Sequence, residues 1–356
     1  MERLRRQAVR GTREDPANRY DRIRVERDAQ AVGDLPDEQG STPTLLYRDA
    51  SRGVLAENNS PDIPFQFSVN PYRGCEHGCI YCYARPTHEY LSFSAGLDFE
   101  RRILVKSAAP ELLRKAFMSP RWQPQTVALS GNTDCYQPVE RQLRITRRIL
   151  EVFREFRNPV SIVTKSALVG RDVDILADLA AHGAVEVMLS LTTLDVDLAR
   201  RMEPWAAPPR SRLGTVRALS AAGIPTGVII APVIPGLNDE EIPRIVAAAA
   251  AAGARSVSWQ LLRLPSPVDE LFAGWLAAHF PDRCERVLGR LRACRGGELT
   301  DARFGHRLRG QGVYVEQIRA LFEVSARRHR LDRPLPPLNT AAFRRPVRSG
   351  EQLRLC

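Results

Sequence analysis

Three cysteines, Cys75, Cys79 and Cys82, stand close together in the sequence NPYRGCEHGCIYCY, which spans residues 70–83. Their spacing is C-x3-C-x2-C, with a tyrosine on each side of the last cysteine. Three thiolates are one ligand short of a closed four-cysteine cluster site. An iron–sulfur cluster held by three cysteines keeps one iron open to another ligand, and an open metal position indicates chemistry rather than a structural role.

A zinc ion is the alternative occupant of this loop, with His77 as the fourth ligand. Three cysteines and one histidine form a legitimate structural zinc set. His77 lies between two of the cysteines, where the chain must wrap tightly, and the sequence has no second zinc-like pair. The spacing therefore favours a cluster over zinc.

The composition predicts a globular protein of a reducing compartment. The chain has 356 residues, 44% of them apolar and 26% charged, enough to bury a sizeable core. A secreted disulfide scaffold is shorter and denser in cysteine, so we expect the cytoplasm. The charged N-terminus lacks the apolar stretch of a signal peptide, and no apolar run is long enough for a bilayer, so no membrane association is predicted. The cysteines outside the loop are scattered, at Cys135, Cys284, Cys294 and Cys356.

The chain is strongly basic, with a net charge of +11. Lys106, Lys115 and Lys165 are the only lysines, and the remaining 49 of the 52 basic residues are arginines. A GC-rich genome would produce this imbalance, which weakens the case that the arginines were selected to contact phosphates. For residues 1–60 we favour a solvated, partly disordered extension over a nucleic-acid-binding arm. For the basic residues 301–356, a wrap over the outside of the core and a polyanion-facing surface are weighted equally.

Short β-rich segments alternate with helical patterns in the predicted core, residues 61–300. Gly183, Gly223 and Gly253 each end a helix before a strand, and Asn238 with Glu241 resembles a capping box. Six parallel βα units predict an α/β fold, too few for an eight-stranded barrel, and a doubly wound sheet is the alternative. In either case ligands gather at the carboxyl ends of the strands, where the cysteine loop belongs. The predicted strands span residues 65–69, 126–129, 160–164, 185–191, 226–231 and 256–261; the predicted helices span 139–156, 172–182, 213–222, 242–252 and 313–328.

In this setting the loop resembles the radical S-adenosylmethionine (SAM) superfamily, whose signature C-x3-C-x-aromatic-C is matched by Cys75, Cys79, Tyr81 and Cys82. The resemblance covers about residues 65–265. It implies a [4Fe-4S] cluster held by the three cysteines, with SAM on the open iron, and cleavage of SAM to a 5′-deoxyadenosyl radical by an electron donor such as a flavodoxin or ferredoxin. It also implies a partial (β/α)6 TIM-type barrel, here with N- and C-terminal extensions.

Within the superfamily the chain is most similar to proteins related to spore photoproduct lyase. The lyase keeps a hydrogen-donating cysteine in a Cys-Thr-Ser-Asp run after the second strand, and this chain has Gly131 at the matching position. Because that cysteine is absent, photoproduct lyase activity itself is not predicted. The segments that carry the similarity are Tyr81-Cys82-Tyr83, Thr133-Asp134 with Glu140, Thr164-Lys165-Ser166, and Ser190.

The resemblance implies five cofactor-binding residues on this rim. Tyr81 would pack near the SAM adenine, and Asn132 and Thr133 lie in the loop that holds the SAM amino group. Lys165 and Ser190 would contact SAM, with Lys165 at or near its carboxylate, where a compact ammonium fits better than a guanidinium fork. The alternatives are core packing for Tyr81, chance survival for Lys165, and a helix cap or turn for Ser190.

Cys135 and Tyr83 are the predicted catalytic residues. Cys135 lies on the rim just past Asp134 and would donate a hydrogen atom or relay a radical, although a lone cysteine is equally often a small packed hydrophobe. Tyr83 matches a tyrosine of the lyase's radical relay, with core packing as its alternative. Glu203 and Arg212 are weaker candidates for an ion pair near the substrate.

The leading prediction is therefore a radical SAM enzyme that abstracts a hydrogen atom from an unknown substrate. Nucleic acid is one candidate, suggested by the basic ends and by the similarity to the lyase; a peptide or a small metabolite is the other. The alternative is a non-enzymatic module that binds nucleic acid or senses redox state, in which the cluster or zinc has no catalytic role.

Overall fold

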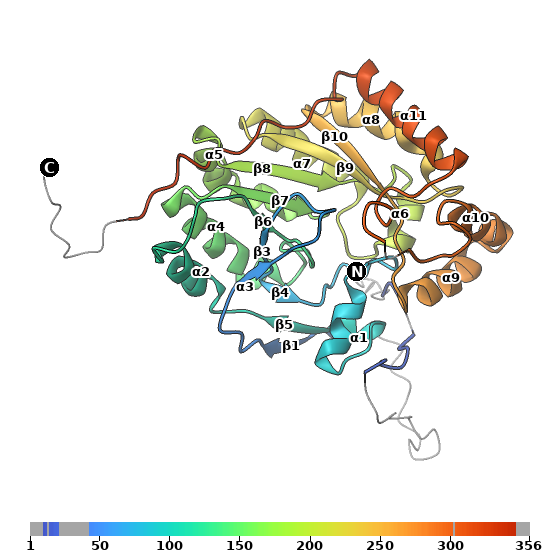
Figure 1. The fold of residues 1–356 in the computed structure, drawn as a ribbon, viewed down its shortest axis with the longest axis horizontal. Helices are drawn as coiled ribbons and strands as arrows, with labels where there is room; N and C mark the ends of the chain where they lie inside the picture. Colours follow the sequence, from blue (N-terminus) through green and yellow to red (C-terminus); the bar gives the residue numbers. More distant parts are fainter. Residues whose placement is uncertain (1–9, 13, 21–42, 302, 347–356) are drawn as a thin grey trace, which may run out of the picture.

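The computed structural model describes residues 10–12, 14–20, 43–301 and 303–346, and a sheet of seven strands lies at its centre (Figure 1). The order across the sheet is β10-β9-β8-β7-β6-β3-β2, and every neighbouring pair is parallel except β2 with β3. In chain order the strands are β2 (Leu55–Glu57), β3 (Phe67–Val69), β6 (Val127–Leu129), β7 (Val160–Thr164), β8 (Val185–Ser190), β9 (Thr226–Val233) and β10 (Ser256–Leu261).

The six parallel strands are the six that the sequence predicts. Among the described residues, β10 and β2 form the two edges of the sheet and do not pair with each other, so the barrel stays open. The α/β prediction of a partial, six-stranded TIM-type barrel is confirmed. All three loop cysteines follow β3 and the two-residue strand Tyr72–Arg73, on the side where the parallel strands end.

Helices follow the strands and cover the sheet (Figure 1). Ile149, Phe153 and Phe156 recur at helical spacing and are fully buried, which gives the helix after β6 the apolar face that the sequence pattern predicts. The glycines predicted to end three of these helices all have positive φ. The helices are α4 (Ile145–Phe156), α5 (Val173–Ala181), α7 (Pro209–Ala221) and α8 (Ile242–Ala251).

One predicted helix is interrupted. The sequence predicts a single helix over residues 139–156, but the chain forms α3 (Glu140–Leu143) and then α4, with Arg144 between them in the left-handed conformation. The buried Glu140 carboxylate accepts a hydrogen bond of 3.1 Å from the backbone N–H of Thr146, in the first turn of α4. Glu140 therefore satisfies an amide that has no partner inside its own helix.

Several elements are not predicted from the sequence. The strands of two to four residues and the shortest helices are too brief to show a period, whereas three of the missed helices have 10 to 13 residues. A second sheet, in the order β1-β5-β4, lies beside the cysteine loop. These elements are β1 (Leu45–Arg48), β4 (Tyr72–Arg73), η1 (Arg85–Leu91), α1 (Leu97–Arg101), β5 (Arg102–Val105), α2 (Ala109–Met118), η2 (Ala167–Asp172), α6 (Val196–Met202), η3 (Asp239–Glu241), α9 (Val268–His279) and α10 (Pro281–Ala293).

The C-terminal segment wraps the end of the sheet away from the cysteine loop. After α11 (Val313–Arg328), the helix predicted at these residues, the chain crosses the molecule past α5 (Figure 1). Asn339 N donates to the Gly183 carbonyl at 2.9 Å, just before β8 begins. Arg345 donates to backbone carbonyls at the end of α2, among them Phe117 at 3.2 Å. Arginine side chains of this segment bind the free carbonyls at helix C-termini. Of the two alternatives for residues 301–356, this supports a wrap around the core rather than a polyanion-facing surface.

Most of the predicted N-terminal extension lies outside the described residues, as do residues 347–356 and therefore Cys356. Residues 10–12 and 14–20 contact η1 and α1, beside the cysteine loop. Among the described residues, no helix is both long and apolar enough to cross a membrane.

Candidate active site

The three predicted cluster cysteines lie on one compact loop between β4 and η1. Their thiols form no disulfide; Cys75 and Cys79 are buried and Cys82 is partly buried. The loop closes through backbone hydrogen bonds from Gly78 N to the Cys75 carbonyl (3.4 Å) and from Cys82 N to the Cys79 carbonyl (3.2 Å). Gly78 has a φ of 66°, and a Cβ atom there would lie 2.8 Å from the Glu100 carboxylate, so the turn requires glycine.

This donor set fits an iron–sulfur cluster. Burial raises the pKa of the Cys75, Cys79 and Cys82 thiols, and a metal cation reverses that preference because it stabilises the thiolate. In the described part of the chain, no three His, Cys, Asp or Glu residues gather closely enough to hold a single metal ion. Three unpaired thiols on one loop match the ligand set of a cluster, in which each cysteine binds a different iron.

A buried carboxylate, Glu203, lies at the centre of a network beside the loop. It accepts hydrogen bonds from the Tyr81 hydroxyl, from the Arg212 guanidinium and, at 2.6 Å, from the Thr192 hydroxyl. The predicted ion pair of Glu203 with Arg212 is confirmed, with side chains 0% and 2% exposed. Burial alone would raise the pKa of the Glu203 carboxyl, but Arg212 and Lys165 lower it to about 2, so Glu203 is ionised.

Lys165 and Ser190, from the ends of β7 and β8, lie together at the edge of this network. Lys165 Nζ donates to Ser190 Oγ at 2.9 Å and lies 5.7 Å from the centre of the Tyr81 ring. Ser190 Oγ in turn donates to the Ala231 carbonyl at 3.1 Å. Three predicted cofactor residues from three separate segments thus come into contact.

The network carries a net positive charge. Two cations, Lys165 and Arg212, share the single carboxylate of Glu203, and Lys165 Nζ lies 4.0 Å from it. The Lys165 side chain is 18% exposed, whereas Arg212 and Glu203 are buried. An anionic group that approached Lys165 would therefore be attracted without displacing the buried pair.

The loop after β6, which carries Asn132 and Thr133, is held mainly through its backbone. The N–H groups of both residues point at Asn70 Oδ1, at 2.8 and 3.3 Å. The buried Thr133 hydroxyl donates to the Tyr72 carbonyl at 2.7 Å, and Asn132 Nδ2 lies 3.5 Å from Thr87 Oγ1. The Thr133 side chain is thus occupied within the loop, while Asn132 faces the segment that follows the cysteines.

Asp134 joins three elements of the rim. Its carboxylate lies 3.3 Å from His77 Nδ1 in the cysteine loop and accepts hydrogen bonds of 2.8 Å from the Thr164 hydroxyl and from Lys165 N. Burial alone would raise the pKa of Asp134, but His77 and the backbone N–H groups of Lys165 and Tyr136 lower it to about 2. Asp134 therefore positions the cysteine loop against the end of β7.

The two predicted catalytic residues differ sharply in exposure. Tyr83 is 48% exposed, and its hydroxyl donates to the Gly131 carbonyl at 3.0 Å. Cys135 is completely buried in the main hydrophobic core, and its N–H donates to Ser130 Oγ at 2.8 Å. The burial supports the packing interpretation of Cys135, and the hydrogen-donor role stays a prediction.

Asn238 and Glu241 do not form the predicted capping box. Asn238 Oδ1 accepts from Ile234 N at 2.6 Å, and its amide donates to the Thr192 carbonyl at 2.8 Å. Glu241 accepts from Leu194 N at 2.9 Å. Both side chains therefore bind backbone groups outside the helix, most of them in the loop after β8, and not the free amides at the start of α8. The pair holds the loop after β8 in place and does not cap α8.

Two further residues that hold the cysteine loop are absent from the sequence-based interpretation. The Arg85 guanidinium donates to the Cys79 carbonyl at 3.0 Å and to the Glu100 carboxylate at 2.5 Å. Both side chains are 0% exposed. A single arginine does not stand out in a chain so rich in arginine. The only hint in the sequence is that Arg85 follows closely after Cys82, the last cysteine of the loop.

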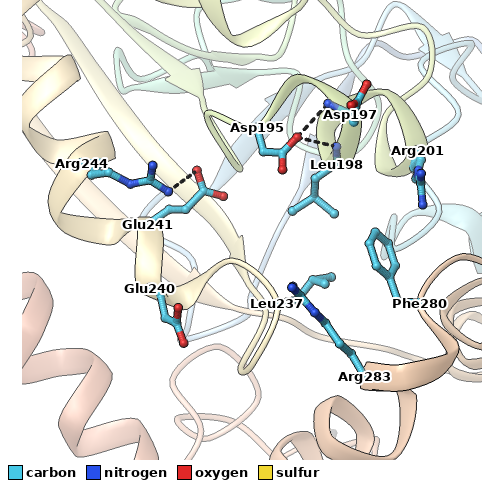
Figure 2. Close-up of a pocket in the computed structure, with 10 residues that line it drawn as sticks. All are labelled: Asp195, Asp197, Leu198, Arg201, Leu237, Glu240, Glu241, Arg244, Phe280 and Arg283. Carbon is cyan, nitrogen blue, oxygen red and sulfur yellow. Dashed lines mark hydrogen bonds and ion pairs between the residues drawn. The ribbon is translucent and has the colours of Figure 1, made fainter.

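A pocket of about 350 Å³ lies beside this region, between α6, the start of α8, and the α9–α10 turn (Figure 2). Figure 2 shows Asp195 capping α6 and Glu241 facing Arg244, with Arg201, Phe280 and Arg283 on the other wall. None of its ten lining residues is a predicted cluster or cofactor residue. Leu198 and Leu237 separate it from the cysteine loop by packing in the same apolar cluster as Cys79 and Tyr81.

Comparisons with known proteins agree with this geometry. The family model described as the radical SAM superfamily matches residues 69–249, just over half of the chain. An uncharacterised protein of Mycobacterium tuberculosis is 34% identical over 345 residues, which cover 90% of this chain and 98% of that protein. An uncharacterised protein of Methanocaldococcus jannaschii is 29% identical over 176 residues, 49% of this chain and 63% of that protein.

Among solved structures, the fold is similar to spore photoproduct lyase. The lyase complexed with dinucleoside spore photoproduct matches with a TM-score of 0.60 and 14% identity, over 81% of this chain and 80% of that one. A mutant lyase with bound AdoMet and dinucleoside spore photoproduct matches with a TM-score of 0.53 and 15% identity, over 80% and 78%. At this identity the likeness extends to the fold alone.

Proposed function

The chain belongs to the radical SAM superfamily, and from this we propose that Cys75, Cys79 and Cys82 hold a [4Fe-4S] cluster to which SAM binds. The single observation that carries the proposal is the set of three unpaired thiols on one tight loop, at the carboxyl end of β3 and beside a cationic network. When bound there and reduced, these groups would supply radical chemistry for hydrogen-atom abstraction, with Cys75, Cys79 and Cys82 holding the cluster. The protein's own residues bind and orient the cofactor and the substrate, and they exclude water from the site.

We assign the SAM carboxylate to Lys165. This is the partly exposed cation of the network, and its Nζ is already held by Ser190 Oγ at 2.9 Å. Tyr81 lies against Lys165, and its hydroxyl is fixed by Glu203, so the ring is oriented before the cofactor arrives. Asn132, in the loop after β6, is the remaining SAM-binding residue of this proposal. A flavodoxin or ferredoxin serves as the electron donor.

Nucleic acid is the substrate class that we favour, ahead of a peptide or small metabolite. Tyr83 presents an exposed aromatic ring beside the cluster loop, a surface on which a base can stack. Arg263, just beyond β10, lies near Tyr83 and supplies a cation for phosphate. Binding of single-stranded DNA or RNA should then weaken steeply between 50 and about 200 mM salt, and salt-insensitive binding would remove this part of the proposal.

Metal analysis tests the cluster. Anaerobically reconstituted protein should contain about four irons and four acid-labile sulfides per chain, the content of one [4Fe-4S] cluster. A Cys79→Ala variant should lose most of both, while Cys284→Ala, a cysteine far along the chain in α10, should keep them. Zinc without sulfide in the wild-type protein would contradict the proposal and favour the structural module. An intact cluster that never cleaves SAM under reducing conditions would favour a redox sensor.

Location of the protein in the cytoplasm stays a prediction.

A further inference from the structure

The described part of the N-terminal segment lies against the elements that support the cysteine loop. The N–H groups of Gly11 and Thr12 donate to the two carboxylate oxygens of Glu100, at 2.9 and 3.2 Å. Gly11 and Thr12 are buried, although the sequence around them predicts a solvated tail. A segment distant in sequence is therefore paired with the helix that lies under the cluster loop.

The contact with the loop itself is closer still. A Cβ atom on Gly11 would lie 1.6 Å from the carbonyl oxygen of Gly78, the glycine between the first two cluster cysteines. No side chain fits in that space, so the backbone of residue 11 packs directly on the backbone of the cysteine loop. The position requires glycine for its small size, since the φ angle of Gly11 is not in the left-handed region.

The same segment also completes α1. The Asp15 carboxylate accepts from Leu97 N at 2.8 Å and from Asp98 N at 3.3 Å, the free amides at the start of that helix. The Glu14 carbonyl accepts from Leu97 N at 3.1 Å. The helix has five residues and begins without a side-chain cap of its own, so its first turn depends on residues 14 and 15.

Glu100 connects this docking to the cluster ligands. Its carboxylate binds Gly11 N, Thr12 N and the Arg85 guanidinium, and Arg85 donates onward to the carbonyl of Cys79 at 3.0 Å. The backbone N–H of Cys75 donates to the Phe99 carbonyl in the same helix at 2.9 Å. Two of the three cysteines are thereby tied to α1, and α1 is tied to the N-terminal segment.

We propose that residues 10–12, with residues 14 and 15, form a clasp that positions the cysteine loop and shields the cluster from solvent and oxygen. This inference rests on the proposed function, because it concerns retention of the cluster. With the clasp in place, Glu100 is fully satisfied and the Gly78 carbonyl is covered. With the clasp displaced, the buried Glu100 loses two backbone donors, water reaches the loop, and the ligands to the cluster become mobile.

The clasp is tested in the full-length, reconstituted protein with Gly11→Val. The matched control is Gly53→Val, because a Cβ atom at Gly53 meets nothing within 4 Å. On exposure to air, the visible absorption of the cluster should decay about tenfold faster in Gly11→Val than in the wild type, while Gly53→Val decays like the wild type. Equal decay in all three proteins would overturn the inference.

A second measurement needs no variant. In hydrogen exchange of wild-type protein, the amides of Gly11 and Thr12 should be protected, because both donate to a buried carboxylate. Exchange at the rate of an open chain would overturn the clasp even if Gly11→Val failed to fold. Failure of the proposed function gives a different result, since a wild-type protein without iron and sulfide would still show the protected amides.

Discussion

Two buried ion pairs contact the cysteine loop, and they are completed in different ways. Arg85 and Glu100 are both 0% exposed, and their partners are backbone groups of the loop, of α1 and of the N-terminal segment. Glu203 and Arg212 are equally buried, but Lys165 adds a second, partly exposed cation. The Arg85–Glu100 pair is buried and has all its partners within the protein, so its role is to hold the loop. The Glu203–Arg212 pair has an additional cation in Lys165, so it can bind an anionic ligand.

The largest expected effect comes from breaking the closed pair. Glu100→Gln leaves the Arg85 guanidinium buried without its charge partner, so the free energy of unfolding should fall by about 3–5 kcal/mol. Urea denaturation of the reconstituted protein measures this. The matched control is Glu316→Gln, which removes the exposed pair of Glu316 with Arg319 and should cost no more than about 0.5 kcal/mol. Similar losses in the two variants would mean that the Arg85–Glu100 pair does not hold the loop.

Binding at the open pair should depend on Lys165. Lys165→Arg replaces a compact ammonium with a wider guanidinium at a site already filled by Ser190 and Glu203, so the Kd for SAM should rise about tenfold. Calorimetric titration of the anaerobic, cluster-loaded protein measures the affinity. Lys115→Arg, at an exposed position on α2, is the control and should bind SAM as the wild type does. An unchanged affinity in Lys165→Arg would refute the assignment.

Acid should act on the open pair through Glu203. Because its pKa in the folded protein, about 2, is below the ordinary value of 4.5, ionised Glu203 stabilises the fold fully above pH 4.5. This contribution declines as the pH falls from 4.5 toward 2, and at pH 3.5 the loss is on the order of 1 kcal/mol. The groups that face Glu203 are Arg212, Lys165, Tyr81 and Cys79.

The measurement compares the pH dependence of unfolding in the wild type and in Glu203→Gln. Asp134 has a similarly lowered pKa, so some acid sensitivity should persist in the variant. Curves of identical slope between pH 5 and 3 would show that Glu203 is not responsible.

The smallest effect belongs to Tyr81→Phe. The change removes one hydrogen bond to Glu203, which keeps Arg212 and Thr192 as partners, so the free energy of unfolding should fall by only about 1 kcal/mol. The ring that lies near Lys165 is retained, so SAM affinity should change by less than about threefold. A loss of affinity as large as that of Lys165→Arg would mean that the hydroxyl itself contacts the cofactor.

The parts of the fold that could be predicted are those in which a short motif or a period carries the information. Cys75, Cys79 and Cys82 are recognisable from spacing alone. Each of the six parallel strands is a short β-rich segment, alternating or mostly apolar, that stands between helical patterns. Lys165 stands out because lysine is rare in this chain. These features are local, so the sequence displays them directly.

The parts that could not be predicted depend on partners far away in the chain. Asn238 and Glu241 have the spacing of a capping box, yet they bind the loop after β8. Arg85 and Glu100 are ordinary residues by composition and become important only because the fold buries them together. Gly11 lies in a stretch that looks like a tail, and its role depends on a contact with a glycine 67 positions later, Gly78. Tertiary contacts override local propensity in all three cases.

The most direct test of the proposed chemistry is reductive cleavage of SAM by the reconstituted protein. With dithionite and SAM under anaerobic conditions, chromatography should detect 5′-deoxyadenosine and methionine in equal amounts. Cys79→Ala should form neither, and Lys165→Arg should form less at sub-saturating SAM. Wild-type protein with a full complement of iron and sulfide that forms no 5′-deoxyadenosine would contradict assignment as a radical SAM enzyme.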